Sequence, residues 1–255
     1  MRCASPLYID RNQIPCNKCY GCRWNKQAAW IYRIKKEAEQ HCSAFFVTLT
    51  YEVQPVKNGI PTLVKSDFQK FMKRLRKINQ GQIKYFACGE YGGKTHRPHY
   101  HAILMGVDNR EKIDKSWSLG MIHIGEVEEA SISYTTKYML KSAETIEGRE
   151  PNFQLMSKGM GKNYLTENMI KWHKASPTNR VYIALRDGVK IPLPRYYREK
   201  IYSEAEWNEI SYHRLIDLEN SEKYLTYAQW KAQQKEIERE DRARNNKRIK
   251  VNDRL

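Results

Sequence analysis

Two histidines, His99 and His101, stand two residues apart in the apolar stretch 99–106 (HYHAILMG), which is typical of a β-strand. Side chains two positions apart point to the same face of a strand, so the two imidazoles converge. A lone His-x-His pair is weak evidence for a metal, because exposed or hydrogen-bonded histidines are common. Glu90 strengthens it, since this residue closes the preceding strand-like stretch and a glycine-rich turn would return the chain alongside it.

The chemistry of this residue set favours a hard divalent cation. Two imidazoles and one carboxylate that leave coordination positions open suit Mg²⁺ or Mn²⁺ acting as a Lewis acid on a phosphate. A closed structural zinc site is less compatible with them. His96 is an alternative ligand, but it lies in the turn between the two stretches. We therefore predict a catalytic metal site formed by Glu90, His99 and His101.

A second constellation is the segment SYTTKYMLK at 133–141, which repeats the pattern Tyr-x-x-Lys. Tyr134 is followed by Lys137 and Tyr138 by Lys141; on a helix Tyr134, Tyr138 and Lys141 share a face, with Lys137 at its edge. With 17 tyrosines in the chain, a pair at this spacing is expected by chance, but the doubled motif is more specific. A phenol, with a pKa of about 10, needs a nearby cation to act as a nucleophile, and lysine or a metal supplies one.

The cysteines are unevenly distributed, because four of the six lie in the first 22 residues: Cys3, Cys16, Cys19 and Cys22. In a reducing compartment such a cluster favours metal binding over disulfides. Tetrahedral structural zinc is the preferred interpretation. An iron-sulfur cluster and free thiols are the alternatives. Cys42 and Cys88 are interpreted as small core residues.

The order of predicted elements indicates the fold class. Helices are expected at 23–40 and at 66–78, the second opened by a Ser66–Gln69 capping box, and strands at 44–51, 83–88, 99–106 and 121–127. A hairpin is expected at 181–193 and charged helical sequence from 203 onward. We predict an α+β fold, an antiparallel central sheet with helices on one face, divided into a Cys-rich segment (1–43), a catalytic core (44–145) and a C-terminal extension (146–255).

The charge balance points to a polyanionic partner. Lys and Arg number 45 against 29 acidic residues, a formal net charge of +16, which favours nucleic acid. The helix at 66–78 exposes several of these cations, a pattern that fits a solvated surface as well as a DNA contact. Neither a long apolar run nor an apolar leader occurs, so we expect a soluble, cytosolic protein without membrane contact. No Walker-type run occurs either, so we expect a host helicase to unwind the DNA.

Several motifs resemble one known superfamily. FFVTLTY, RPHYHAIL and YTTKYMLK, in this order, resemble the successive motifs of rolling-circle replication initiators of the HUH endonuclease superfamily. The flanking stretches PCNKCYGCR, SDFQKFMKRLRK, CGEYG, FQLMSKGMG and PRYY resemble the replication initiators of gokushovirus-type microviruses, which are single-stranded DNA phages. By inspection this likeness covers roughly residues 1 to 200.

The resemblance implies a fold and a set of roles. It implies an RRM/ferredoxin-like HUH sheet, metal-binding His99 and His101, Glu90 as third ligand, and Tyr134 and Tyr138 as paired nucleophiles. The implied activity is nicking of single-stranded DNA at the plus-strand origin through a 5′-phosphotyrosine intermediate, with religation, in the cytoplasm of a bacterial host. The alternatives are a tyrosine transposase or relaxase of the same superfamily and a non-catalytic, basic, zinc-containing single-stranded-DNA-binding protein.

Overall fold

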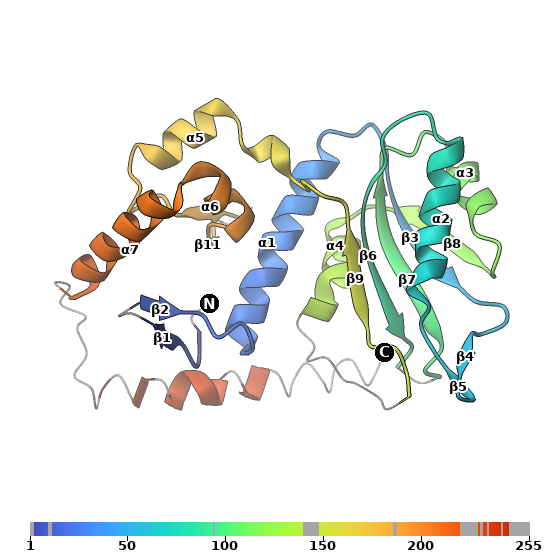
Figure 1. Cartoon of the computed structure of the whole chain (residues 1–255), viewed down its shortest axis with the longest axis horizontal. Coiled ribbons are helices and arrows are strands. Elements are labelled where there is room, and N and C mark those ends of the chain that lie inside the picture. The colour runs from blue at the N-terminus through green and yellow to red at the C-terminus, as the bar shows by residue number, and fades with distance from the viewer. Residues whose placement is uncertain are drawn as a thin grey trace. The chain divides into compact units, whose positions relative to one another are not determined.

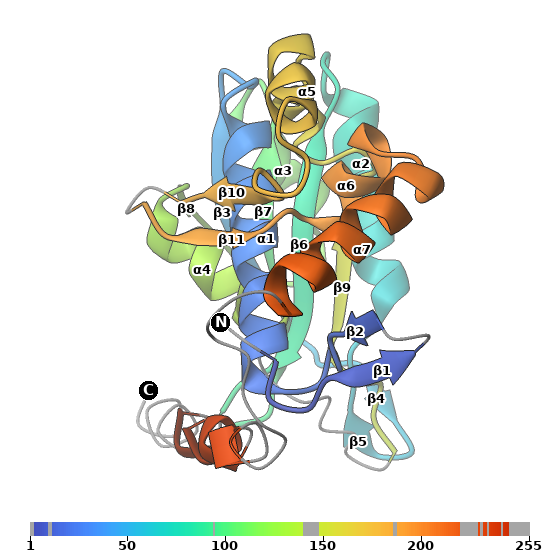
Figure 2. The ribbon, with the colours of Figure 1, turned by 90° about the vertical axis from the view of Figure 1, so that its left-hand side faces the viewer.

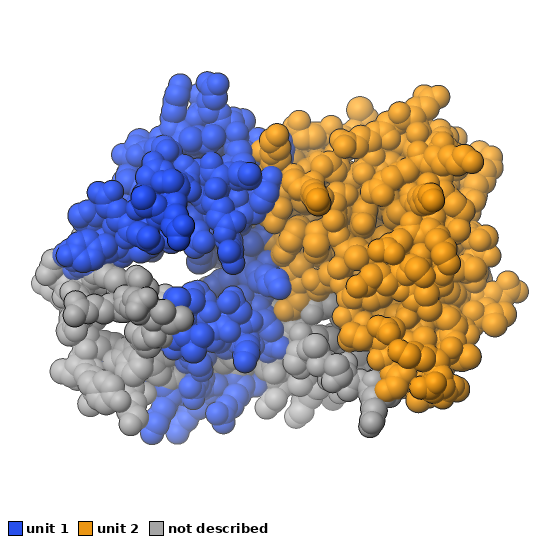
Figure 3. Space-filling view, in the orientation of Figure 1, with its two compact units in different colours: residues 1–29, 163–254 blue, residues 30–162, 255 orange. Residues whose placement is uncertain are grey.

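The structure, a computed structural model, describes residues 3–9, 12–93, 95–139, 148–185, 188–219, 229, 232–233, 235–240 and 242–244. It divides into two units, one made of residues 30–162 and the other of residues up to 29 together with residues from 163 onward (Figure 3). Among the described residues, no helix combines the length and the apolar character that a membrane span requires.

An antiparallel sheet is the centre of the 30–162 unit, with the strand order β8-β3-β7-β6-β9. Its strands are β3 (Ala44–Thr50), β6 (Lys84–Tyr91), β7 (Pro98–Met105), β8 (Ile122–Glu126) and β9 (Phe153–Met156). Helix α2 (Lys65–Ile78) connects β3 to β6, and α3 (Arg110–Ser116) connects β7 to β8. The succession strand, helix, strand, strand, helix, strand with this order is ferredoxin-like, which confirms the predicted α+β sheet.

Helices cover both faces of this sheet, whereas the sequence led us to expect them on one (Figure 1). Helices α2 and α3 pack on the face that carries Leu49 and Tyr100. The other face carries Phe86 and Ile103, which pack against the second half of α1 (Tyr20–Ala38) and against α4 (Glu129–Thr136). The reason is that both faces of the central strands are apolar, so each needs a covering layer.

The start of α2 differs from the expected capping box. The helix begins at Lys65, and the residue before it, Val64, has no capping side chain. Instead the phenol of Tyr100 accepts from the Val64 amide at 3.1 Å and donates to the Val64 carbonyl at 2.8 Å. The predicted Ser66–Gln69 box is therefore wrong, because a side chain from the neighbouring strand holds the backbone there.

Smaller elements complete the 30–162 unit. A two-residue hairpin, β4 (Val56–Lys57) and β5 (Ile60–Pro61), precedes α2, and the 3₁₀ turn η1 (Lys137–Met139) follows α4. Helix α1 anchors the glycine-containing stretch after β9, because Arg33 Nε donates to the Met160 carbonyl at 3.0 Å and Glu37 accepts from the Gly161 amide at 2.7 Å.

The other unit contains two short hairpins and three helices (Figure 2). The hairpins are β1 (Leu7–Ile9) with β2 (Asn12–Ile14) and β10 (Tyr182–Ala184) with β11 (Lys190–Pro192). The helices are α5 (Glu167–Lys174), α6 (Arg195–Ile201) and α7 (Glu204–Glu219), and the 3₁₀ turn η2 (Lys162–Tyr164) lies at the boundary between the units. The hairpin predicted at 181–193 is confirmed, although Asp187 of its turn lies outside the described residues.

Candidate active site

Neighbouring strands bring the three predicted metal ligands together. Glu90 on β6 pairs in register with His99 on β7, so their side chains leave the same face of the sheet, as does that of His101. Glu90 Oε1 lies 3.0 Å from His99 Nε2 and 2.9 Å from His101 Nε2. The three candidate ligand atoms lie within 4.8 Å of one another. His96 lies in the exposed turn and is not part of this group.

Two atoms of the cluster are suited to hold a cation. Glu90 Oε2 and His101 Nε2 are buried, and neither has a hydrogen bond of acceptable geometry to the described residues. Glu90 itself is only 1% exposed. Buried polar atoms without a partner are costly, and a coordinated divalent cation would satisfy both of these. The residues present therefore fit a metal ion.

The outer nitrogens of both imidazoles are also partnered. His101 Nδ1 lies 2.9 Å from the Thr48 hydroxyl of β3, and His99 Nδ1 lies 3.0 Å from the Arg97 carbonyl. Phe46 stacks on the His101 ring, with 5.7 Å between centroids. Such contacts orient metal-binding histidines and select their tautomer. The sequence analysis missed Thr48, although its position on the same face of β3 as Phe46 was a readable signal.

We expect Thr48→Val to weaken metal binding about 10- to 100-fold, because loss of a partner of a ligating histidine typically has this effect. Valine keeps the β-branched shape, so the strand should be preserved. Metal affinity is measured by Mn²⁺ titration calorimetry. Thr50→Val is the matched control, since the Thr50 hydroxyl donates to the Met121 carbonyl and contacts no ligand. Equal affinities for both variants would contradict the role of Thr48.

The three ligands differ in their proton affinity. Burial acts to raise the pKa of Glu90, but His101 and His99 outweigh it and lower this pKa to about 2. Burial acts to lower the pKa of both histidines. For His99 the hydrogen bond to Glu90 prevails and the pKa is raised, whereas for His101 burial prevails and the pKa is lowered. Glu90 is thus an ionised carboxylate at neutral pH, and His101 retains a lone pair for a cation.

Tyr134 of α4 is the predicted nucleophile that the structure places at this cluster. Its hydroxyl donates to Glu90 Oε1 at 3.4 Å, and its ring edge contacts His101 at 4.9 Å between centroids. Burial and then the negative charge of Glu90 raise the pKa of Tyr134. Lys137 Nζ lies 3.5 Å from the centre of the same ring, where a cation favours negative charge on the phenol. The side chain is 39% exposed, which leaves it open to a substrate.

The second half of the tyrosine motif lies beyond the α-helix. Helix α4 ends at Thr136, and Tyr138 belongs to the 3₁₀ turn η1. Thr135 and Thr136 donate their hydroxyls to carbonyls four residues earlier, at 2.8 Å each, a local bond that competes with regular helix geometry. The side chain of Tyr138 and all of Lys141 lie outside what the structure describes. The shared face of the two tyrosines therefore stays a prediction.

The N-terminal cysteines form a separate cluster. The Sγ atoms of Cys3, Cys16, Cys19 and Cys22 all lie within 4.8 Å of one another, and two pairs are 4.0 Å apart. Ligands at about 2.3 Å from a tetrahedral zinc lie about 3.8 Å from each other, so the sulfur arrangement is close to that of a zinc site.

Backbone amides surround these sulfurs. Cys3 Sγ accepts from the Cys16 amide at 3.3 Å, and Cys16 Sγ accepts from the amides of Lys18 and Cys19 at 3.4 and 3.3 Å. Burial acts to raise the pKa of Cys16, but these amides outweigh it and lower the pKa to about 7. Burial raises the pKa of Cys22. An amide-lined sulfur cluster of this kind is suited to thiolates that bind a metal.

The two remaining cysteines differ from each other. Cys88 is buried in the sheet, as predicted, but Cys42 is exposed at the start of β3, so its interpretation as a core residue is wrong. The apolar residues that follow Cys42 in the sequence belong to the strand, whereas Cys42 precedes it.

Comparisons with known proteins agree with this geometry. The family model of replication-associated protein ORF2 matches residues 44–143. The chain is 33% identical to replication-associated protein ORF2 of Spiroplasma virus 4, over 80% of this chain and 72% of that protein. It is 29% identical to replication-associated protein VP4 of Bdellovibrio phage phiMH2K, over 72% of this chain and 66% of that protein.

A third relative is replication-associated protein ORF4 of Chlamydia phage 1, which is 24% identical over 80% of this chain and 58% of that protein. No solved structure matches the chain at a significant level.

Proposed function

Because the chain belongs to the family of phage replication-associated proteins, we propose that it is the initiation endonuclease of rolling-circle replication. In this proposal it nicks single-stranded DNA at the plus-strand origin and later rejoins the strand. One observation carries the chemical part: the Tyr134 hydroxyl contacts the carboxylate of a Glu90, His99 and His101 cluster that fits a divalent cation. A nucleophile beside a Lewis-acid site is what phosphoryl transfer requires.

The cluster would supply the electrophilic half of the reaction. Mg²⁺ or Mn²⁺ held by Glu90, His99 and His101 would act as a Lewis acid on the scissile phosphate. Thr48 and the Arg97 carbonyl orient the two imidazoles through their outer nitrogens. Glu90 stays ionised because its pKa is about 2, so the ligand set carries a negative charge that favours a cation.

Tyr134 would supply the nucleophilic half. Its phenol oxygen forms a bond to phosphorus, the bond from phosphorus to the 3′-oxygen breaks, and the 3′-oxygen leaves as a hydroxyl with the proton given up by the phenol. The 5′-phosphate is then an ester of tyrosine, a better leaving group than an alkoxide. Attack by a 3′-hydroxyl reverses these bonds and reseals the strand without ATP. Lys137, 3.5 Å from the ring centre, stabilises the phenolate character that develops.

Tyr138 would provide the second nucleophile, with Lys141 as its cation. One tyrosine stays on the 5′ end after the first cut, and the other cuts the regenerated origin after one circuit. The released 3′-hydroxyl then closes the circle. Two alternating tyrosines distinguish this role from that of a transposase or relaxase that makes a single cut.

The direct test is covalent capture. A labelled single-stranded oligonucleotide that carries the cognate plus-strand origin is incubated with the full chain and Mn²⁺ or Mg²⁺, then resolved on a denaturing gel. We expect a protein–DNA band that withstands SDS and is absent when the metal is chelated. Binding without such a band would contradict the proposal and favour the non-catalytic single-stranded-DNA-binding protein.

The cellular setting follows from the same proposal. Action on a phage origin places the protein in the cytoplasm of the bacterial host. The sequence contains no Walker-type phosphate-binding run, so strand separation is assigned to a host helicase. Addition of purified host helicase to a nicked duplex origin should extend unwinding beyond the nick.

We assign structural zinc to Cys3, Cys16, Cys19 and Cys22. The mutual sulfur distances and the amide hydrogen bonds support a closed four-thiolate site, which lacks the open position that catalytic metals need. Such a site contributes folding free energy when the metal binds.

We expect about one zinc per chain in the purified protein by elemental analysis, and its loss in Cys19→Ala together with a lower melting temperature. Cys42→Ser is the matched control, because Cys42 is exposed and outside the cluster, and it should keep the metal. A folded wild-type protein without zinc would contradict the assignment; iron in its place would indicate an iron-sulfur cluster instead.

A further inference from the structure

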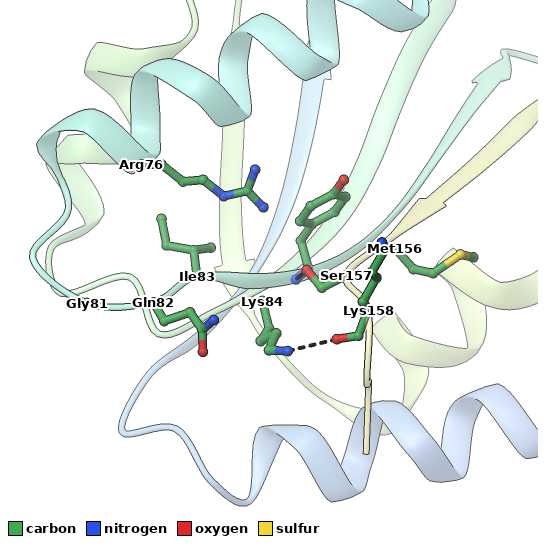
Figure 4. Close-up of a pocket in the computed structure, with 9 residues that line it drawn as sticks. Arg76, Gly81, Gln82, Ile83, Lys84, Met156, Ser157 and Lys158 are labelled. Carbon is green, nitrogen blue, oxygen red and sulfur yellow. Dashed lines mark hydrogen bonds between the residues drawn. The ribbon is translucent and has the colours of Figure 1, made fainter. Parts of the chain in front are cut away.

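A groove of about 580 Å³ lies at the edge of the sheet, beside the start of β6 and beyond the end of β9 (Figure 4). It belongs to the 30–162 unit and shares no lining residue with the metal cluster. Arg76 of α2, Lys84 of β6 and Lys158 line it. We propose that this groove binds phosphates of the DNA strand at a second site, away from the scissile phosphate.

The charge of the groove supports an anionic ligand. Its lining includes Arg76, Lys84 and Lys158 and no carboxylate, while Gln82 and Ser157 add neutral polar groups. Arg76 and Lys158 are exposed, so their charges face solvent and a ligand. Phosphate oxygens are the usual partners of such convergent cations.

Two contacts hold these cations in place. The Arg76 guanidinium lies 5.4 Å from the centre of the Tyr85 ring, and Lys84 Nζ donates to the Lys158 carbonyl at 2.8 Å. Figure 4 draws Arg76 on one side of the start of β6 and the Lys84–Lys158 bond on the other. Because these groups are already oriented, less side-chain entropy is lost when a phosphate binds.

The groove continues a basic helix face. The exposed side of α2 carries Lys70, Lys73 and Lys77 in addition to Arg76. The single acidic residue of α2, Asp67, accepts from the Tyr51 hydroxyl and lies 3.7 Å from Lys70 Nζ. Most of this positive charge is therefore not neutralised on the helix, and it leads toward the groove. A DNA strand has the complementary, repeated negative charge.

The distance to the metal cluster fits a single bound strand. Lys84 and Glu90 lie on the same strand β6, six positions apart, and their side chains leave the same face. At about 3.4 Å per residue they are about 20 Å apart, which corresponds to about six nucleotide steps along one strand of B-form DNA. Nucleotides that flank the cut would thus reach the groove. The choice of DNA as ligand rests on the proposed function.

The test measures how DNA binding depends on salt. The Arg76→Gln/Lys158→Gln double variant and the wild-type chain are titrated with fluorescent oligo(dT) of about 20 nucleotides between about 50 and 200 mM salt. Loss of two phosphate contacts should reduce the slope of log affinity against log salt by about 1.4, since each contact to a single strand contributes about 0.7. The single variant Lys158→Gln should lose about half of this; the side chain of Lys158 is exposed, so folding should be unaffected.

The matched control removes the same charge elsewhere in the unit. Lys112 and Lys115 of α3 pair with Asp108 and Glu111, so Lys112→Gln/Lys115→Gln should leave the slope unchanged. Equal slopes for the wild type and the groove variants, or an equal loss in the control, would overturn the proposal. So would a groove variant that keeps its oligo(dT) affinity and loses binding to poly-glutamate, which would assign the groove to an acidic protein.

A second readout separates this inference from the proposed function. The groove variants should nick a saturating short origin oligonucleotide at the wild-type rate, because no groove residue contacts the metal cluster. A wild-type chain that does not nick would contradict the proposed function, but the oligo(dT) comparison would still decide whether the groove binds DNA.

Discussion

The Tyr134→Phe/Tyr138→Phe double variant is expected to form no covalent adduct with origin DNA, whereas each single variant retains some cleavage of a short origin oligonucleotide. Phenylalanine keeps the ring packing of Tyr134 against His101 and removes only the oxygen that forms the phosphate ester. On a replicating circle each single variant should fail in the second transfer and accumulate over-length or unclosed strands. Denaturing gels measure the adduct, and two-dimensional gels measure the circles.

The control for this prediction is a tyrosine away from the cluster. Tyr212 of α7 is 62% exposed and belongs to the other unit, so Tyr212→Phe should cleave and close circles as the wild type does. Circular dichroism of all variants checks the fold. Peptide mapping of the wild-type adduct to a third tyrosine, or adduct formation by the double variant, would refute the paired nucleophiles.

His99→Ala or His101→Ala should reduce nicking on the order of 10³-fold or more while origin binding is largely retained. A Lewis acid contributes several kilocalories per mole to such a reaction, and each ~1.36 kcal/mol is about tenfold in rate. DNA affinity, by contrast, comes mainly from phosphate contacts to Lys and Arg. Single-turnover nicking at controlled free Mn²⁺ measures the first quantity, and filter binding in EDTA measures the second.

The matched control for the histidines is His96→Asn. His96 lies in the exposed turn before β7 and has a positive φ of 51°, a conformation that asparagine also adopts. This variant should nick at the wild-type rate. Full nicking by either ligand variant, or an equal loss in His96→Asn, would contradict the assignment of Glu90, His99 and His101.

The parts of the fold that were predictable from sequence are those with a strong local period. The alternation in AFFVTLTY and HYHAILMG placed β3 and β7, and Phe68, Phe71, Met72 and Leu75 at helical spacing placed α2. Strand β9 was missed because all four of its residues are half-buried and its pairing depends on a distant partner. A Cβ at Gly89 would lie 2.8 Å from the Phe153 ring, so the glycine of β6 makes room for β9. No local pattern carries that requirement.

The candidate site was predictable to the same extent. Glu90, His99 and His101 lie in one hairpin, where period-two alternation and a short turn specify which side chains meet. Tyr134 is 44 residues from Glu90, and its contact depends on how α4 packs on the sheet, which spacing within the motif does not encode. The end of α4 at Thr136 likewise follows from hydroxyl-to-carbonyl bonds rather than from apolar spacing.

The central position of β7 has a consequence for how the metal acts on the whole unit. This strand is paired along its length with β3 on one side and β6 on the other, so His99 and His101 have no local route to disorder. Their ligand geometry is lost only when the sheet itself unfolds. A cation that binds the native state alone then stabilises it by mass action, by about 2.7 kcal/mol at a hundredfold excess over its dissociation constant. Thermal melting under graded Mn²⁺ therefore reports occupancy of the site without any DNA.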